Sequence, residues 1–300
     1  MNFNDFKNLS EQEKRHYLST LLIDNGNQTD KRFPVLKSML EDIYVPFPLT
    51  DIQESFVVGR LLGSDDKVGC HFYCEFEKKD LNIAKLKHTW NQLVNHHEML
   101  HTIINSLGTQ IVLHKVPDYD MPTHDLKNAS HETLEAHRRK IRNELSHKLY
   151  EAGQWPLFDL QFSLLPNDNV LIHLSIDELI VDASSVDLLL DQWYQLYHDS
   201  SYELPDIDVS FRDMVMAWKE FEGSSVFQQD ITYWMNKLKN APGGPSLHVN
   251  QKPELRDGYS YIPRYRLEGE LGEGLWNQLK QKAGELEVSP TVLLLTLFSQ

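Results

Sequence analysis

Cysteine is scarce in this chain, and long hydrophobic runs are missing from it. Only Cys70 and Cys74 occur among 300 residues, and on the strand predicted there they would lie roughly 13 Å apart, too far for a disulfide. No apolar run reaches about 18 residues, the length that spans a bilayer. Residues 1–5 also lack the basic start of a signal peptide. The sequence therefore predicts a protein of the reducing cytoplasm.

Positive charge is also in short supply. The 29 lysines and arginines face 44 aspartates and glutamates, which gives a formal net charge of −15. Nucleic acids and anionic membranes both attract basic surfaces, so we expect neither as a partner. With 41% hydrophobic residues the chain can bury a sizeable core. Its length would suit one large domain or two medium ones.

Several catalytic and phosphate-binding signatures are absent. The chain contains neither G-x-G-x-x-G nor GxxxxGK[ST], the glycine-rich loops that hold phosphates. It has no G-x-S-x-G elbow either, and neither Ser184 nor Ser185 lies between glycines. These absences argue against nucleotide chemistry and a serine hydrolase in these residues, and we expect no directly bound cofactor.

Hydrophobic periodicity predicts strands and helices that mix without regular βαβ alternation, which is typical of an α+β fold with a sheet of mixed direction. Strands are expected near residues 70–77, 102–106, 110–114, 158–165, 170–176 and 259–267. Helices are expected near residues 10–23, 35–43, 51–60, 81–94, 130–150, 184–198, 211–222, 228–239 and 275–286, and from 290 onward. The aromatic residues at helical spacing are predicted to be core, namely Trp193, Trp218, Phe221 and Trp234.

The chain divides into three segments. Residues 1–45 read as helical, and are either a docking segment or a simple extension. Residues 46–240 form the main unit, and residues 241–300 open with a linker rich in proline and glycine before a second unit begins. The chain stops inside an apolar helical pattern without a stop signal, so we expect a fragment of something longer.

Residues 97–101 spell HExxH, the zinc-protease pattern in which two histidines bind metal and the glutamate activates water. A third ligand at the longer zincin spacing is missing. His97 also shares a predicted helical stripe with Trp90 and Leu93, so we expect His97 in the core, His101 at the surface, and no metal. A zinc hydrolase remains an alternative that metal analysis of the purified chain would test.

Residues 177–185 place two aspartates where an apolar strand runs out into an amphipathic helix. Asp182 is positioned as the helix N-cap, where a carboxylate accepts bonds from free backbone amides. A structural cap is the simplest interpretation of Asp182.

Several segments together resemble one family. Residues 47–60 resemble the FPLTxxQxAYxxGR motif of heterocyclization domains in nonribosomal peptide synthetases, with Ser55-Phe56 in place of Ala-Tyr. Residues 97–100 resemble the RHxML motif of that family. The other matches, in family order, are Asp177, Asp182 and Ser185 to DxxxxDxxS, residues 233–247 to YWxxRLxxLPxxPxLPL, and Ser289-Pro290-Thr291 to the start of the next helix motif.

The resemblance implies the chloramphenicol-acetyltransferase-like fold of condensation domains, in which two lobes meet at a tunnel. Residues 46–240 would be the first lobe, and residues 241–300 the linker and the start of the second. It also implies a reaction: a carrier-bound acyl thioester condenses with a carrier-bound cysteine, serine or threonine, and cyclodehydration gives a thiazoline or oxazoline. The implied partners are carrier proteins with phosphopantetheine arms and adjacent adenylation or synthetase modules, in siderophore-like biosynthesis.

The resemblance also suggests roles for the junction. Ordinary condensation domains carry HHxxxDG here, and the alignment puts Asp177 at the first histidine and Glu178 at the second. We expect Asp177 and Glu178 to face the chemistry, with Glu178 contributing to proton transfer; alternatively, Glu178 is a bystander.

The resemblance implies that Asp182 is mainly structural, because the matching aspartate of the family pairs with an arginine of the RHxML region. In this chain His96 and His101 occupy the corresponding positions, so either a histidine takes that role or the partner lies elsewhere. Ser185 completes the motif.

Two functions from different classes remain. One is a cyclizing enzyme, and the other is a non-cyclizing condensation-type module kept for docking or gating in a synthetase assembly. We expect the isolated piece to be inactive, and to expose apolar surface where the second lobe belongs.

Overall fold

The computed structural model describes residues 33–62, 69–105, 108–244, 254–256, 259–261 and 269–299. Contacts divide the chain into two compact units, Met1–Ser246 and Leu247–Gln300. The helix expected at residues 10–23 lies outside the described residues. Within the described ranges, no helix is both long and apolar enough to cross a bilayer.

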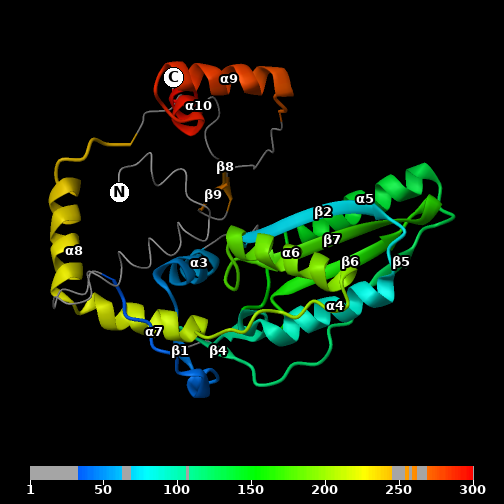
Figure 1. The fold of residues 1–300 in the computed structure, drawn as a ribbon, viewed down its shortest axis with the longest axis horizontal. Helices are drawn as coiled ribbons and strands as arrows, with labels where there is room; N and C mark the ends of the chain where they lie inside the picture. Colours follow the sequence, from blue (N-terminus) through cyan, green and yellow to red (C-terminus); the bar gives the residue numbers. More distant parts are fainter. Residues whose placement is uncertain are drawn as a thin grey trace. The chain divides into compact units, whose positions relative to one another are not determined.

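A four-stranded sheet is the centre of the first unit (Figure 1). Its strands in spatial order are β2 (His71–Lys79), β7 (Asn169–Asp177), β6 (Phe158–Leu164) and β5 (Thr123–Asp125). β7 runs antiparallel to β2 and β6, whereas β5 runs parallel to β6. The expected α+β class with a mixed sheet is confirmed, although periodicity does not predict β5, because three polar residues carry no apolar pattern.

The rest of the described part of this unit consists of a second sheet, helices and short 3-10 turns. A second sheet has the order β1 (Phe47–Pro48), β4 (Thr109–Val112) and β3 (Thr102–Ile104). The helices are α3 (Asp51–Leu62), α4 (Ile83–His96), α5 (His131–Leu145), α6 (Ala183–His198), α7 (Phe211–Glu222) and α8 (Ser225–Leu238). Short 3-10 turns are η2 (Leu40–Asp42), η3 (Glu98–His101) and η4 (Pro166–Asp168).

Three of the predicted helices differ from the structure. Helix α3 continues two residues beyond Arg60. Helix α4 begins at Ile83 and not near residue 81, because Asn82 caps it and accepts from the Lys85 amide at 3.0 Å. Asp80, in the preceding turn, takes a positive φ of 58°. The helix expected at residues 35–43 is reduced to η2. Aspartate serves a cap and a left-handed turn equally well, so composition alone does not separate the two.

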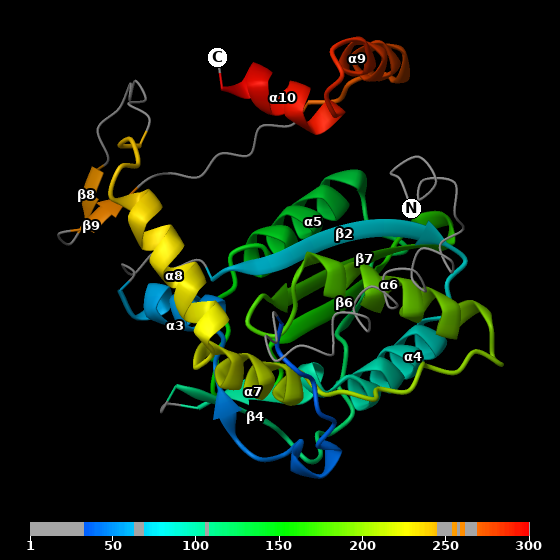
Figure 2. The ribbon, with the colours of Figure 1, turned by 60° about the vertical axis from the view of Figure 1, so that its left-hand side comes forward.

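One face of the main sheet is apolar and packs against α4 and α6 (Figure 2). The β7 side chains Ile172, Leu174 and Ile176 lie on it, as their period-two spacing predicts. Trp90 of α4 contacts Phe158 and Trp193 edge-on, with ring centroids 5.8 and 5.1 Å apart. These fully or nearly fully buried rings hold the two helices onto the sheet.

The opposite face of the sheet is polar and lies against α5 (Figure 2). His173 is fully buried there, and its Nδ1 lies 3.0 Å from the hydroxyl of Tyr73. That hydroxyl donates to Glu75 at 3.1 Å, and Glu75 pairs with Arg138 and Arg142 of α5. Because the tyrosine has one proton and gives it to Glu75, His173 Nδ1 carries the proton of its own contact. Protonation of His173 would add an N–H at Nε2, which is buried without a hydrogen-bond partner, so burial favours the neutral ring.

His173 gives a pH dependence of stability. Burial lowers the pKa of His173 from 6.5 in the unfolded chain to about 4. Between these two pH values the histidine is protonated in the unfolded chain and neutral in the folded chain. The free energy of unfolding therefore decreases as the pH falls through this window. We expect His173→Gln to remove roughly 3 kcal/mol of that dependence. Urea unfolding of both proteins from pH 7 to pH 4 measures it, and parallel curves would contradict the assignment.

Two predicted core aromatics are in fact exposed. Trp193 is buried, but Trp218 is 43% exposed and Trp234 62% exposed. In α8 the residues Ile231, Trp234, Met235 and Leu238 recur at helical spacing, and all are exposed. Periodicity predicts an apolar helix face without saying what covers it.

The second unit has two short strands and two helices within the described ranges. Strand β8 (Glu254–Arg256) pairs antiparallel with β9 (Tyr259–Tyr261). Helices α9 (Glu273–Glu285) and α10 (Pro290–Phe298) follow. Ser289 caps α10 as expected, with its Oγ accepting from the Val292 amide at 3.2 Å.

Candidate functional site

At the junction from β7 to α6, the structure confirms the predicted cap. Asp182 is the N-cap of α6, and its Oδ1 accepts from both the amide and the hydroxyl of Ser185 at 2.7 Å. These bonds, the hydroxyl first, lower the pKa of Asp182. The carboxylate is thus ionised and fixed at the positive end of a 16-residue helix.

Substitution at Asp182 separates capping from chemistry. We expect Asp182→Ala to lower the free energy of unfolding by about 1 kcal/mol, whereas Asp182→Asn, which keeps the oxygen acceptor, loses only a few tenths. Denaturant unfolding measures both. Equal losses in the two variants would show that the cap bond is not what Asp182 contributes.

Asp177 lies on the polar side of the sheet. Only 1% of it is exposed, and Nη2 of Arg60 lies 2.6 Å from both of its carboxylate oxygens. Its Oδ1 also accepts from the Leu179 amide at 2.9 Å. The expectation that Asp177 faces the chemistry is therefore not met. Its strand position, two residues beyond Ser175, places it with the polar face, and that parity could have been read from the sequence.

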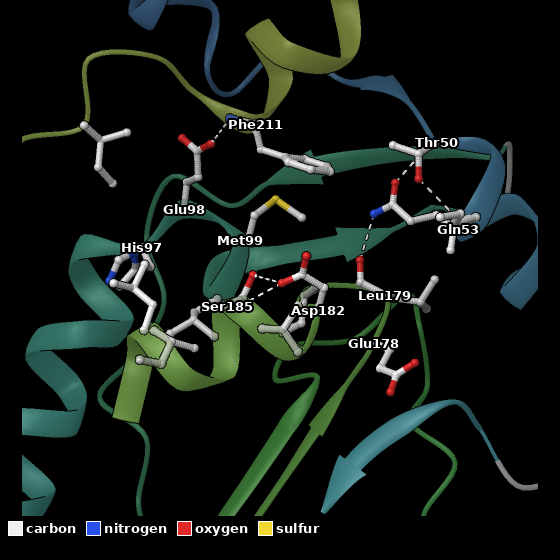
Figure 3. A pocket seen from close by; sticks show the side chains of 17 residues that line it. Thr50, Gln53, His97, Glu98, Met99, Glu178, Leu179, Asp182, Ser185 and Phe211 are labelled. Carbon is white, nitrogen blue, oxygen red and sulfur yellow. Dashed lines mark hydrogen bonds between the residues drawn. The ribbon is translucent and has the colours of Figure 1, made fainter. Parts of the chain in front are cut away.

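A pocket of about 430 Å³ opens beside the junction (Figure 3). It draws its polar side chains from α3, the end of α4, η3 and the junction. Its lining consists of Thr50, Ile52, Gln53, His97, Glu98, Met99, Leu100, Glu178, Leu179, Ile180, Val181, Asp182, Ser185, Leu188, Leu189, Ile207 and Phe211. Three of the four predicted site residues, Glu178, Asp182 and Ser185, meet here, and Asp177 does not.

Glu178 is exposed at the edge of this pocket. Its backbone amide is bonded to the Cys70 carbonyl at 3.0 Å, which holds the residue next to the start of β2. Figure 3 shows its carboxylate pointing away from Asp182 and Ser185. A carboxylate in this position is free to meet a substrate or solvent at the pocket edge.

A pair of glutamines anchors the junction from the other side. Gln53 and Gln110 are both buried and exchange amide hydrogen bonds of 2.9 Å. Gln53 also donates to the Leu179 carbonyl at 2.7 Å. Sequence reasoning missed this role, although Gln53 is the glutamine of the FPLTxxQ motif. Both N–H groups of the buried Gln53 side-chain amide are hydrogen-bonded. The bond to Leu179 therefore fixes the turn between Asp177 and Asp182.

The HExxH pattern is broken by the fold. Helix α4 ends at His96, His97 is its C-cap, and residues Glu98–His101 form the separate turn η3. Glu98 accepts from the Phe211 amide, and burial, with a contribution from Asp213, raises its pKa. Across the residues that the structure describes, no group of three or more histidine, cysteine, aspartate or glutamate side chains is placed to hold a metal ion.

The histidines of this region have partners other than Asp182. His96 Nε2 lies 3.0 Å from the Pro205 carbonyl, and burial lowers the pKa of His101, which bonds to backbone at Val94 and Leu113. Of the two alternatives for Asp182, the contacts of the described residues do not favour a histidine partner. Arg60 pairs with Asp177, the first aspartate of the motif.

Comparison with known proteins agrees with these motifs. A protein-family model described as "Condensation domain" matches residues 46–299. Bacitracin synthase 1 of Bacillus licheniformis is 31% identical over 264 residues, which is 86% of this chain and 5% of that protein. Pyochelin synthetase PchF of Pseudomonas aeruginosa is 30% identical over 85% of this chain and 14% of its own length. The chain thus spans a small part of these relatives.

Solved structures give the same result. The cyclization-docking bidomain of the EpoB nonribosomal peptide synthetase from Sorangium cellulosum superposes with a TM-score of 0.79 and 30% identity, covering 97% of this chain and 58% of that one. The nonribosomal peptide synthetase FmoA3 gives a TM-score of 0.69 over 88% of this chain and 26% of its own. The expected chloramphenicol-acetyltransferase-like fold is confirmed. The chain belongs to the condensation-domain family of nonribosomal peptide synthetases, a family of acyltransferase-type enzymes.

Proposed function

We propose that this chain is part of a heterocyclization domain. It condenses a carrier-bound acyl thioester with a carrier-bound cysteine, serine or threonine, and then cyclodehydrates the product to a thiazoline or oxazoline. The observation that carries the proposal is the junction itself, where Asp182 and Ser185 form one hydrogen-bonded unit at the pocket. The motif resemblance adds that Glu178 takes the place of the second histidine of HHxxxDG. The similarity to a cyclization domain supports it, as does a 26% identity to phenyloxazoline synthase MbtB of Mycolicibacterium paratuberculosis.

The proposal includes an organisation and a set of partners. Residues 46–240 act as the first lobe, residues 241–300 as the linker and the start of the second, and residues 1–45 as an extension or docking segment. The substrates arrive on phosphopantetheine arms of carrier proteins, next to adenylation or other synthetase modules, in the cytoplasm. The product belongs to a siderophore-like or thiazoline-containing peptide, and no cofactor is bound directly.

In this proposal, some of the described residues position the junction and one transfers a proton. The Arg60–Asp177 pair and the Gln53–Gln110 pair fix both ends of the turn that carries Glu178. Asp182 is held by Ser185 and orients the start of α6. Glu178 is the exposed carboxylate available for proton transfer as water is lost from the ring.

One observation favours the non-cyclizing alternative. The Glu178 carboxylate points away from Asp182 and Ser185 (Figure 3), so a bystander Glu178 in a module that condenses, docks or gates would have the same geometry.

The choice of acceptor tests the proposal. The complete protein that contains this chain is mixed with a loaded donor carrier and an acceptor carrier bearing cysteine, serine, threonine or alanine. We expect products lacking one water for the first three and an uncyclized amide for alanine, which has no side-chain nucleophile. Uncyclized amides with all four acceptors would establish the alternative.

A further inference from the structure

The pocket holds one imidazole for which the proposed mechanism has no use. His97 lines it from the end of α4 and is half-buried. Its amide bonds to the Leu93 carbonyl, and its carbonyl accepts from the Leu100 amide at 3.0 Å. The residue is therefore held by backbone on both sides, and the ring is carried at a fixed point of the pocket wall.

A contact from α6 sets the protonation of this ring. His97 Nε2 lies 2.6 Å from Oε1 of Gln192, a residue only 5% exposed. An amide oxygen can only accept, so Nε2 carries the proton and Nδ1 carries the lone pair. Among the described residues Nδ1 has no hydrogen-bond partner, and it is not one of the buried side-chain atoms that lack one. Nδ1 is therefore not enclosed by the described residues, and its lone pair is accessible on a residue that lines the pocket.

Burial keeps this ring neutral. Burial lowers the pKa of His97, the neighbouring His96 lowers it further, and the Gln192 bond opposes both. The titratable groups that share the pocket with it are Glu98, Glu178 and Asp182. Of these, Glu98 has one oxygen bonded to Phe211 and the other buried, and Asp182 is bonded to Ser185. His97 is thus a free base at neutral pH.

We propose that His97 is the general base for amide formation. As the acceptor amine nitrogen bonds to the thioester carbonyl carbon, it gives a proton to Nδ1. When the carbon–sulfur bond breaks, the imidazolium returns that proton to the leaving pantetheine thiolate. This inference rests on the first, amide-forming step of the proposed function, and Gln192 acts as the positioning residue for it.

Single-turnover measurement of amide formation tests the assignment in the complete protein. We expect His97→Gln to slow this step about 10²–10⁴-fold. Imidazole in the buffer should restore part of the rate to His97→Ala. Gln192→Glu, which sets a carboxylate against Nε2, should move the acidic limb of the pH profile upward. His88→Gln, an exposed histidine on the same helix, is the matched control and should leave the rate unchanged.

Three results overturn the proposal. The first is a His97→Gln rate within about threefold of the wild type. The second is a slow His97→Ala that imidazole does not restore, which would mark a structural role. The third needs no turnover: nitrogen-15 NMR of histidine-labelled protein that shows a proton on Nδ1 of His97 at pH 7. Amide without loss of water in the wild type would contradict cyclization alone, so the two failures are distinguishable.

Discussion

Replacing Asp177 by asparagine is expected to lower the free energy of unfolding by about 3–5 kcal/mol, because it leaves Arg60 as a buried charge without a counterion. The Arg60 side chain is only 12% exposed and Asp177 only 1%, so water cannot solvate the guanidinium that remains. Oδ1 of the same carboxylate accepts from the Leu179 amide, and asparagine keeps that acceptor, so the loss reports on the ion pair. Urea unfolding at pH 7 measures the loss.

A double-mutant cycle with Arg60→Met isolates the pair. The double variant should be more stable than the sum of the two single losses predicts, since removal of both charges leaves neither unpaired. Glu220→Gln is a suitable control because its ion pair with Lys37 is exposed, at 70% and 64%, and such pairs contribute about 0–1 kcal/mol. If Asp177→Asn cost no more than this control, the buried pair would not anchor the junction.

Replacing Glu178 by glutamine is expected to slow loss of water about 10²–10⁴-fold while amide formation continues. The substitution keeps the size and hydrogen-bonding shape of the side chain and removes its ability to accept a proton. Because Glu178 is exposed, its folding stability should change by less than about 0.5 kcal/mol. Quenched time points of the acceptor carrier, resolved by mass, give the two rates separately.

Asp187→Asn supplies the control for this prediction. Asp187 is an exposed carboxylate on α6, just beyond the junction, and it does not line the pocket. Its removal should leave both rates at the wild-type level. Wild-type rates for both steps in Glu178→Gln would make that residue a bystander and return the proton transfer to another group.

Local signals predicted the elements that carry the site. The alternation in residues 170–176 predicted β7, and Asp182 as N-cap located the start of α6. These signals act within a few residues, so one sequence contains them in full. The end of α3 was missed because Gly59 and Arg60 resemble a stop, although tertiary contacts of Arg60 extend the helix past them.

Long-range pairings could not be predicted in the same way. Arg60 and Asp177 lie 117 positions apart, and Gln53 and Leu179 lie 126 apart. The two residues of each pair belong to separate motifs, and neither motif alone indicates which residue the other will contact. The contact of His97 is another such pairing: its stripe with Trp90 and Leu93 predicted a core position, whereas α4 ends at His96 and His97, half-buried, lies against Gln192 of α6.

The mass of the product on the acceptor carrier tests the central claim most directly. The complete protein is given an acyl-loaded donor carrier and a cysteine-loaded acceptor carrier, and the acceptor is weighed intact over time. Heterocyclization predicts that the acyl-cysteinyl adduct appears first and is then converted to a species lacking one water. An adduct that accumulates and never loses water would contradict the account.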